Sequence, residues 1–72
     1  MKHKYNIGDI LKIKFHKEIK YAVIINEKFI DSDSAGSFIY EYIIQGLEGQ
    51  KYWDSEYNLE LRIKEATYER KK

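Results

Sequence analysis

The chain has 72 residues, a net charge of +1, no cysteine, no proline and two histidines. This length is enough for one domain and too short for two, and a domain of this size buries only about 60% of its unfolded surface. Without cysteine, a disulfide framework and a structural zinc site are excluded. We therefore expect one small domain without metal or cofactor, held together by apolar burial and sheet hydrogen bonds.

The sequence predicts a cytoplasmic protein that does not contact a membrane. The longest uninterrupted apolar run, residues 21–25, is far shorter than a membrane span. No apolar run of signal-peptide length follows the N-terminal residues 1–4. The lack of cysteine is also compatible with a reducing compartment.

Charge is unevenly distributed along the chain. Residues 1–20 carry six lysines and two acids, residues 21–60 carry two lysines and eight acids, and residues 61–72 carry five bases and two acids. Both ends are therefore basic and the centre is acidic. This pattern bears on binding only when the two ends meet in space.

The first half of the chain predicts two strands and a loop. Residues 10–15 alternate between apolar residues and lysines, which is the period-2 pattern of a half-buried strand. Residues 21–25 are apolar at every position, which favours a strand covered on both sides, and Phe29-Ile30 extends it. The small polar residues 31–37 then predict a solvated loop.

The second half predicts three further strands. Residues 38–44 alternate again, but both faces carry large apolar residues, so the pattern leaves open whether Tyr40 or Ile39 faces inward. A hairpin turn at residues 46–49 leads into a short strand over residues 50–54. Ser55 is expected to cap one tight 3-10 turn, after which Leu59 enters the core.

Leu61 and Ile63 are expected to form the last strand. Five short strands with regular turn signals indicate a barrel or a sandwich, and this chain is too short for a sandwich. The sequence therefore predicts an all-β fold, a five-stranded SH3-like small barrel over residues 1–65 with one 3-10 turn before the last strand. Residues 66–72 are expected to form a basic tail.

Two motifs resemble the ends of SH3-like barrels of the KOW, Tudor and chromo-like kind. The opening Tyr5-Asn6-Ile7-Gly8-Asp9-Ile10-Leu11 is similar to their Y-x-x-G-D-x-V entry. The segment from Gly49 to Leu59, with Trp53 and Glu56, is similar to their G-x-x-x-W-x-x-E-x-x-L ending. Small uncharacterised proteins from phages and prophages often carry both ends. The resemblance covers residues 5–63 and implies that the first and last strands are neighbours, which would bring the basic ends together.

No motif predicts an enzyme or a metal site. Asp31, Asp33 and Gly36 match three positions of an EF-hand loop, but Ala35 and Tyr42 stand where two further ligands are needed. The serines have no evident base beside them. The histidines lie apart in sequence and lack convergent partners. We expect no catalytic residue, no metal and no small-molecule substrate.

The leading function prediction rests on the aromatic residues of the third and fourth strands. Tyrosine and tryptophan give large, rigid contact areas and are enriched at binding hot spots, and acids beside them favour a cationic peptide or, more narrowly, a methyl-lysine. We expect a non-enzymatic phage or mobile-element accessory protein that binds a host protein. The expected binding residues are Tyr40, Tyr42, Tyr52, Trp53 and Glu56.

Two alternatives stay open. A basic face would attract the phosphate backbone of a nucleic acid, although the pI of 7.9 lies below the value of about 9 typical of dedicated nucleic-acid domains. The residues of that face would be Lys12, Lys14, Arg62 and Lys64. The third reading is a structural or assembly component, which would associate with itself.

Overall fold

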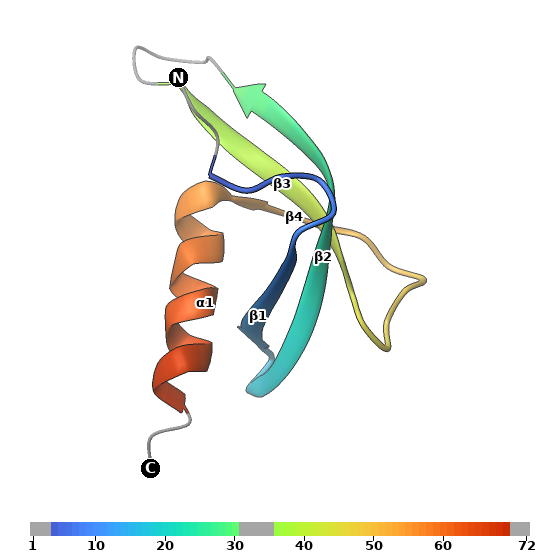
Figure 1. Cartoon of the computed structure of the whole chain (residues 1–72), viewed down its shortest axis with the longest axis vertical. Coiled ribbons are helices and arrows are strands. Elements are labelled where there is room, and N and C mark those ends of the chain that lie inside the picture. The colour runs from blue at the N-terminus through green and yellow to red at the C-terminus, as the bar shows by residue number, and fades with distance from the viewer. Residues whose placement is uncertain (1–3, 31–35, 70–72) are drawn as a thin grey trace.

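The computed structural model describes residues 4–30 and 36–69, which form a four-stranded antiparallel sheet and one helix packed against it (Figure 1). The strands lie side by side in chain order: β1 (Ile10–Phe15), β2 (Glu18–Ile30), β3 (Ser37–Ile44) and β4 (Tyr52–Ser55). The helix α1 (Glu56–Glu69) follows β4 directly. We call the sheet face under α1 the inner face and the opposite face the outer face.

A two-residue turn joins β1 and β2. Phe15 pairs with Glu18, and the residues between them, His16 and Lys17, both have positive φ, 51° and 69°. Positive φ at both central residues is the backbone of a type I′ turn, which suits the right-handed twist of paired strands. Neither residue is a glycine, so this turn is strained.

A β-bulge bends β2. Its register with β3 shifts between Ile24 and Asn26, so Ile25 is an extra residue without a partner across the ladder. A bulge increases the local twist and bends its strand, and β2 curves along the length of the molecule in Figure 1. The predicted extension of this strand through Phe29-Ile30 is confirmed.

The helix begins where its sequence signals are strongest. The Ser55 Oγ accepts a hydrogen bond from the backbone N–H of Asn58 at 3.1 Å, so the predicted cap is confirmed. An acid, Glu56, follows in the first turn, where the helix dipole favours negative charge. Leu59, Ile63 and Ala66 recur at helical spacing and pack toward the sheet.

The core lies between the inner face and α1. The alternation predicted for residues 10–15 holds, since Ile13 and Phe15 are buried. Tyr40, not Ile39, faces inward, which resolves the ambiguity of that strand. The largest fully buried side chains are Tyr40, Tyr42, Ile13, Ile24, Ile44 and Leu59.

The fold is predominantly β, as predicted, but it is an open sheet rather than a closed five-stranded barrel. The predicted 3-10 turn and fifth strand are wrong, because α1 occupies residues 56–69. This segment contains good helix formers and no glycine or proline. The apparent alternation of Leu61 and Ile63 is too short to define a period, and Leu61 is 40% exposed on the helix.

The predicted boundary between the domain and a C-terminal tail differs from the structure. Residues 66–69, expected in a tail, continue α1, and Ala66 is buried in the helix. The EF-hand-like residues Asp31 and Asp33 and the tail residues 70–72 lie outside the described residues.

Candidate functional site

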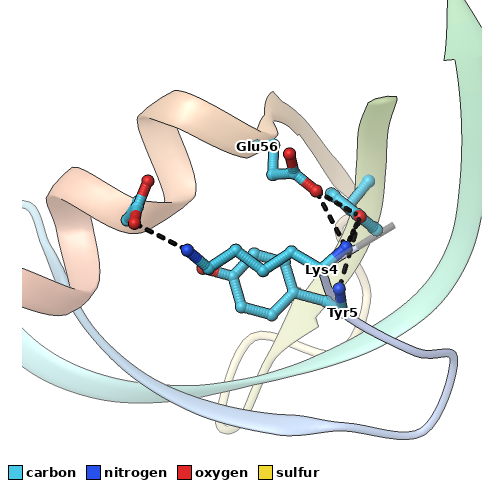
Figure 2. Close-up of polar contacts among 5 residues, drawn as sticks. Lys4, Tyr5 and Glu56 are labelled. Atoms are coloured by element: carbon cyan, nitrogen blue, oxygen red, sulfur yellow. Dashed lines mark hydrogen bonds and ion pairs between the residues drawn. The ribbon is translucent and has the colours of Figure 1, made fainter. Parts of the chain in front are cut away.

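The hydroxyl of Tyr40 joins three parts of the molecule beneath the start of α1. It donates a hydrogen bond to Glu56 Oε2 at 2.9 Å and accepts the backbone N–H groups of Lys4 and Tyr5 at 3.1 and 3.3 Å. The Lys4 N–H also donates to Glu56 Oε2 at 2.9 Å (Figure 2). The hydrogen bonds of the buried Tyr40 side chain thus link the N-terminal segment and α1 to β3.

The side chain of Lys4 adds a second contact between the N-terminal segment and α1. Its Nζ lies 2.7 Å from Glu60 Oε2, one turn beyond Glu56. The hydrogen bond and the lysine charge lower the pKa of Glu60, and the same bond raises the pKa of Lys4. Both side chains are exposed, so this ion pair positions the N-terminal segment and adds little stability.

A second polar network lies deeper under the helix. The Tyr42 hydroxyl donates to Asp54 Oδ2 at 2.5 Å, and Arg62 Nε donates to the same oxygen at 3.0 Å. The Arg62 guanidinium also reaches the carbonyl oxygen of Lys14 at 3.4 Å and lies 5.5 Å from the ring centre of Phe15. This network links β1, β3, β4 and α1.

These contacts assign most of the predicted protein-binding residues to the interior of the fold. Tyr40 and Tyr42 are 0% and 1% exposed, so they cannot line a binding groove. Glu56 is held by Tyr40, and the ring of Tyr52 lies 5.0 Å from that of Phe15 on the inner face. Trp53 alone among the five faces outward. The five residues therefore do not form one surface.

The outer face carries a strip of apolar residues that α1 does not cover. Ile10 lies opposite Val23, and Val23 lies opposite Ile43, so the three form a row across three strands. Tyr21 adjoins this row on β2. Ile10 is 68% exposed and Tyr21 is 47% exposed. We call these four residues, Ile10, Tyr21, Val23 and Ile43, the outer strip.

The outer strip, together with Gln45 and Glu48, lines a partly open groove of about 220 Å³. Glu48 is held in place because its Oε2 accepts the N–H of Gly46 at 3.0 Å. This bond lowers the pKa of Glu48. On the opposite side of the strip, Lys12 lies directly across from Tyr21. The outer strip therefore has an acid of the groove after β3 on one side and, outside the groove lining, a lysine of β1 on the other side.

The structure brings together some of the predicted basic residues. β1 and α1 are in contact, and the Arg62 guanidinium reaches Lys14, so residues 10–15 lie close to residues 61–64 as expected, but against a helix and not as two neighbouring strands. Lys12 and Lys14 belong to the outer face, however, whereas Arg62 is paired with Asp54 and Lys64 is exposed on the helix. The four residues do not form one continuous stripe.

Sequence reasoning missed the outer strip, although a signal for it was present. Residues 21–25 are apolar throughout and both faces of residues 38–44 carry large apolar residues. That pattern predicts strands covered on both sides. In the described residues α1 packs on the inner face of the sheet only. Within this part of the chain, the apolar residues of the outer face therefore have no helix that covers them.

The described residues hold no group of three or more histidines, cysteines or acids that could bind a metal ion. No helix within residues 4–30 and 36–69 has the length and apolar character needed to cross a membrane.

Comparison with known proteins assigns the chain to no family. No protein-family model matches the chain, and neither a curated protein nor a solved structure is detectably similar to it. The resemblance to SH3-like barrels of the phage type therefore stays a prediction.

Proposed function

We propose that this protein is a non-enzymatic binding module that docks another protein on the outer face of its sheet. The observation that carries the proposal is the outer strip, an apolar patch across three strands in which Ile10 and Tyr21 are exposed and Val23 and Ile43 are half-buried. An antiparallel sheet with one face on its core normally presents polar residues on the other face. A contiguous apolar patch on the second face marks an interaction site.

The shape of the groove favours a protein over a small ligand. Small-molecule pockets enclose about 300–1,000 Å³ and bury most of their ligand, whereas this groove is partly open and holds about 220 Å³. Trp53 stands on the same face and is 45% exposed. Tyrosine and tryptophan are the residues that most often dominate the binding energy of protein interfaces.

The partner chemistry follows from the groove edges. A protein that presents apolar side chains to the outer strip, with an acid facing Lys12 and a base facing Glu48, would complement both charged groups beside the strip. The sequence resemblance predicts a host protein as a partner and a phage or mobile-element origin for the chain, whereas the groove edges specify only the chemistry of the surface that docks here.

Site-specific photo-cross-linking of the full chain in cells tests the proposal. A photoreactive phenylalanine, p-benzoylphenylalanine, replaces Tyr21 on the outer face in one variant and Tyr57 on α1 in a matched control. Both positions carry an exposed tyrosine, 47% and 69% respectively. We expect a defined protein adduct from position 21 and none from position 57. The absence of any protein adduct from position 21 overturns the proposal.

Nucleic-acid binding is the second candidate, favoured by the position of Lys12 and Lys14 on the outer face beside Tyr21. Lysines beside exposed aromatic rings suit single-stranded nucleic acid, whose bases stack on the rings. A gel-shift series at increasing salt tests this candidate, since phosphate contacts weaken steeply with salt. Absence of a shift at low salt excludes it.

A further inference from the structure

We infer that the occupant of the outer face is a second copy of the same chain, related by a two-fold axis that runs parallel to the strands. This inference rests on the proposed function, because it names the partner of the same surface. The two outer strips would pack face to face, as the inner faces of two sheets do in a sandwich.

The charges at the groove edges are arranged for self-complementarity. Lys12 lies opposite Tyr21, and the carbonyl oxygen of Tyr21 accepts the N–H of Gln45 at 2.9 Å. Lys12, Tyr21 and Gln45 therefore lie at one level of the sheet. Glu48 lines the same groove as Tyr21 and Gln45. The lysine and the acid thus flank the outer strip from opposite sides, Lys12 on β1 and Glu48 after the end of β3.

Symmetry then selects one arrangement. A two-fold axis parallel to the strands exchanges the β1 side of one copy for the β3 side of the other, so the side of Lys12 lies over the side that carries Glu48 in its partner, and this pairing of opposite charges occurs twice. An axis perpendicular to the strands and in the plane of the interface would instead place β1 over β1. Lys12 and Lys14 would then face their own copies, and like charges placed together disfavour association.

The side chains that would form this interface are already positioned. Glu48 is fixed by its hydrogen bond to the Gly46 N–H, and the apolar row is built on paired strands rather than on a loop. Preorganised groups lose less conformational entropy on binding. A small chain without disulfides also gains stability when a partner covers its remaining apolar face.

Sedimentation analysis of charge-reversal variants tests the inference. We expect the wild-type chain to show a monomer–dimer equilibrium between micromolar and millimolar concentration. Lys12→Glu or Glu48→Lys alone should weaken the dimer by about tenfold or more, because each places like charges in contact twice. The double variant Lys12→Glu/Glu48→Lys should restore the dissociation constant to within about threefold of wild type.

Matched control variants on α1 distinguish an effect of charges at the proposed interface from an effect of net charge alone. Lys64→Glu and Glu65→Lys make the same charge changes at exposed helix positions and should leave the equilibrium unchanged. Circular dichroism establishes that every variant remains folded. Failure of the double variant to recover, or equal loss in the controls, overturns the proposed arrangement.

Two outcomes distinguish failure of the dimer from failure of the protein-binding function. A wild-type chain that stays monomeric throughout, while position 21 cross-links to a different protein, overturns the dimer and leaves the protein-binding function standing. A monomeric chain with no adduct from position 21 overturns both.

Discussion

Tyr42 and Tyr21 lie on neighbouring strands of the same sheet, but they face opposite sides of it. Tyr42 is 1% exposed and its hydroxyl bonds to Asp54, whereas Tyr21 is 47% exposed on the edge of a groove. The same contrast separates the inner face, where the tyrosine hydroxyls donate to Glu56 and Asp54 and Arg62 donates to Asp54, from the outer face. Residue type alone therefore does not distinguish a core tyrosine from a surface one.

The comparison also shows how each face contributes to the molecule. On the inner face, polar side chains fix the position of α1, since a buried hydroxyl must find a partner. On the outer face, apolar side chains remain available to a second molecule. We therefore expect substitutions on the inner face to change folding, and substitutions on the outer face to change association.

The largest effect should come from Leu59, which is fully buried between α1 and the sheet. Leu59→Ala removes apolar contacts and leaves a cavity, so it should lower the free energy of unfolding by about 3 kcal/mol. Leu61→Ala, two residues away on the same helix and 40% exposed, should cost less than about 1 kcal/mol. Urea denaturation measures both. Equal losses would contradict the assignment of the inner side of α1.

A smaller effect is expected from the phenol hydroxyls. Tyr40→Phe removes the hydroxyl that accepts the N–H groups of Lys4 and Tyr5 and donates to Glu56, while the hydrogen bond from the Lys4 N–H to Glu56 remains. It should lower the free energy of unfolding by about 1–3 kcal/mol. Tyr21→Phe, on the outer face, should change it by less than about 0.5 kcal/mol. Thermal or urea unfolding of both variants would reveal whether the Tyr40 network carries this stability.

The inner face should also set the alkaline limit of stability. Burial raises the pKa of Tyr42 above its ordinary value of 10, and the hydrogen bond to Asp54 raises it further; burial also raises the pKa of Tyr40. The folded chain holds these protons more tightly than the unfolded chain, so these groups leave stability unchanged below pH 10 and reduce it as the pH rises above 10. Tyr42→Phe should make this alkaline loss shallower. Urea titrations between neutral pH and pH 12 measure it, and an unchanged slope would contradict the role of Tyr42.

The smallest effect belongs to the turn between β1 and β2, which lies on neither face. Lys17 has a φ of 69°, a conformation that glycine adopts without the strain of a side chain. Lys17→Gly should raise the free energy of unfolding by about 0.5–1 kcal/mol and leave association unchanged. Lys51→Gly, outside this turn, is the control and should not stabilise. Destabilisation by Lys17→Gly would mean that the turn is not strained.

Much of the sheet could be predicted from the sequence, because alternation over residues 10–15 and the turn residues at 46–49 report local backbone preferences. The cap at Ser55 could be predicted for the same reason. The length of α1 could not be predicted. Over so short a stretch, Leu61 and Ile63 fit both the period of a strand and the period of a helix, and the motif resemblance favoured a strand there. The choice between Tyr40 and Ile39 was undetermined because both are large and apolar.

The candidate site was harder to predict than the fold. Tyr40, Tyr42 and Glu56 have the composition of a binding surface, but their long-range hydrogen bonds, such as that between Lys4 and Tyr40, show that they stabilise the fold. Sequence patterns carry no information on such pairings. The outer strip depends on which face of the sheet α1 covers, and that is decided by tertiary packing.

A concentration series of two-dimensional amide NMR spectra tests most directly whether the outer face is the interaction surface. On moving from dilute to concentrated protein, we expect amide shifts at the outer strip and near Glu48, with constant shifts at Tyr57 and Leu61 on α1. Shifts confined to the helix, or spectra that do not change with concentration, would contradict self-association through the outer face.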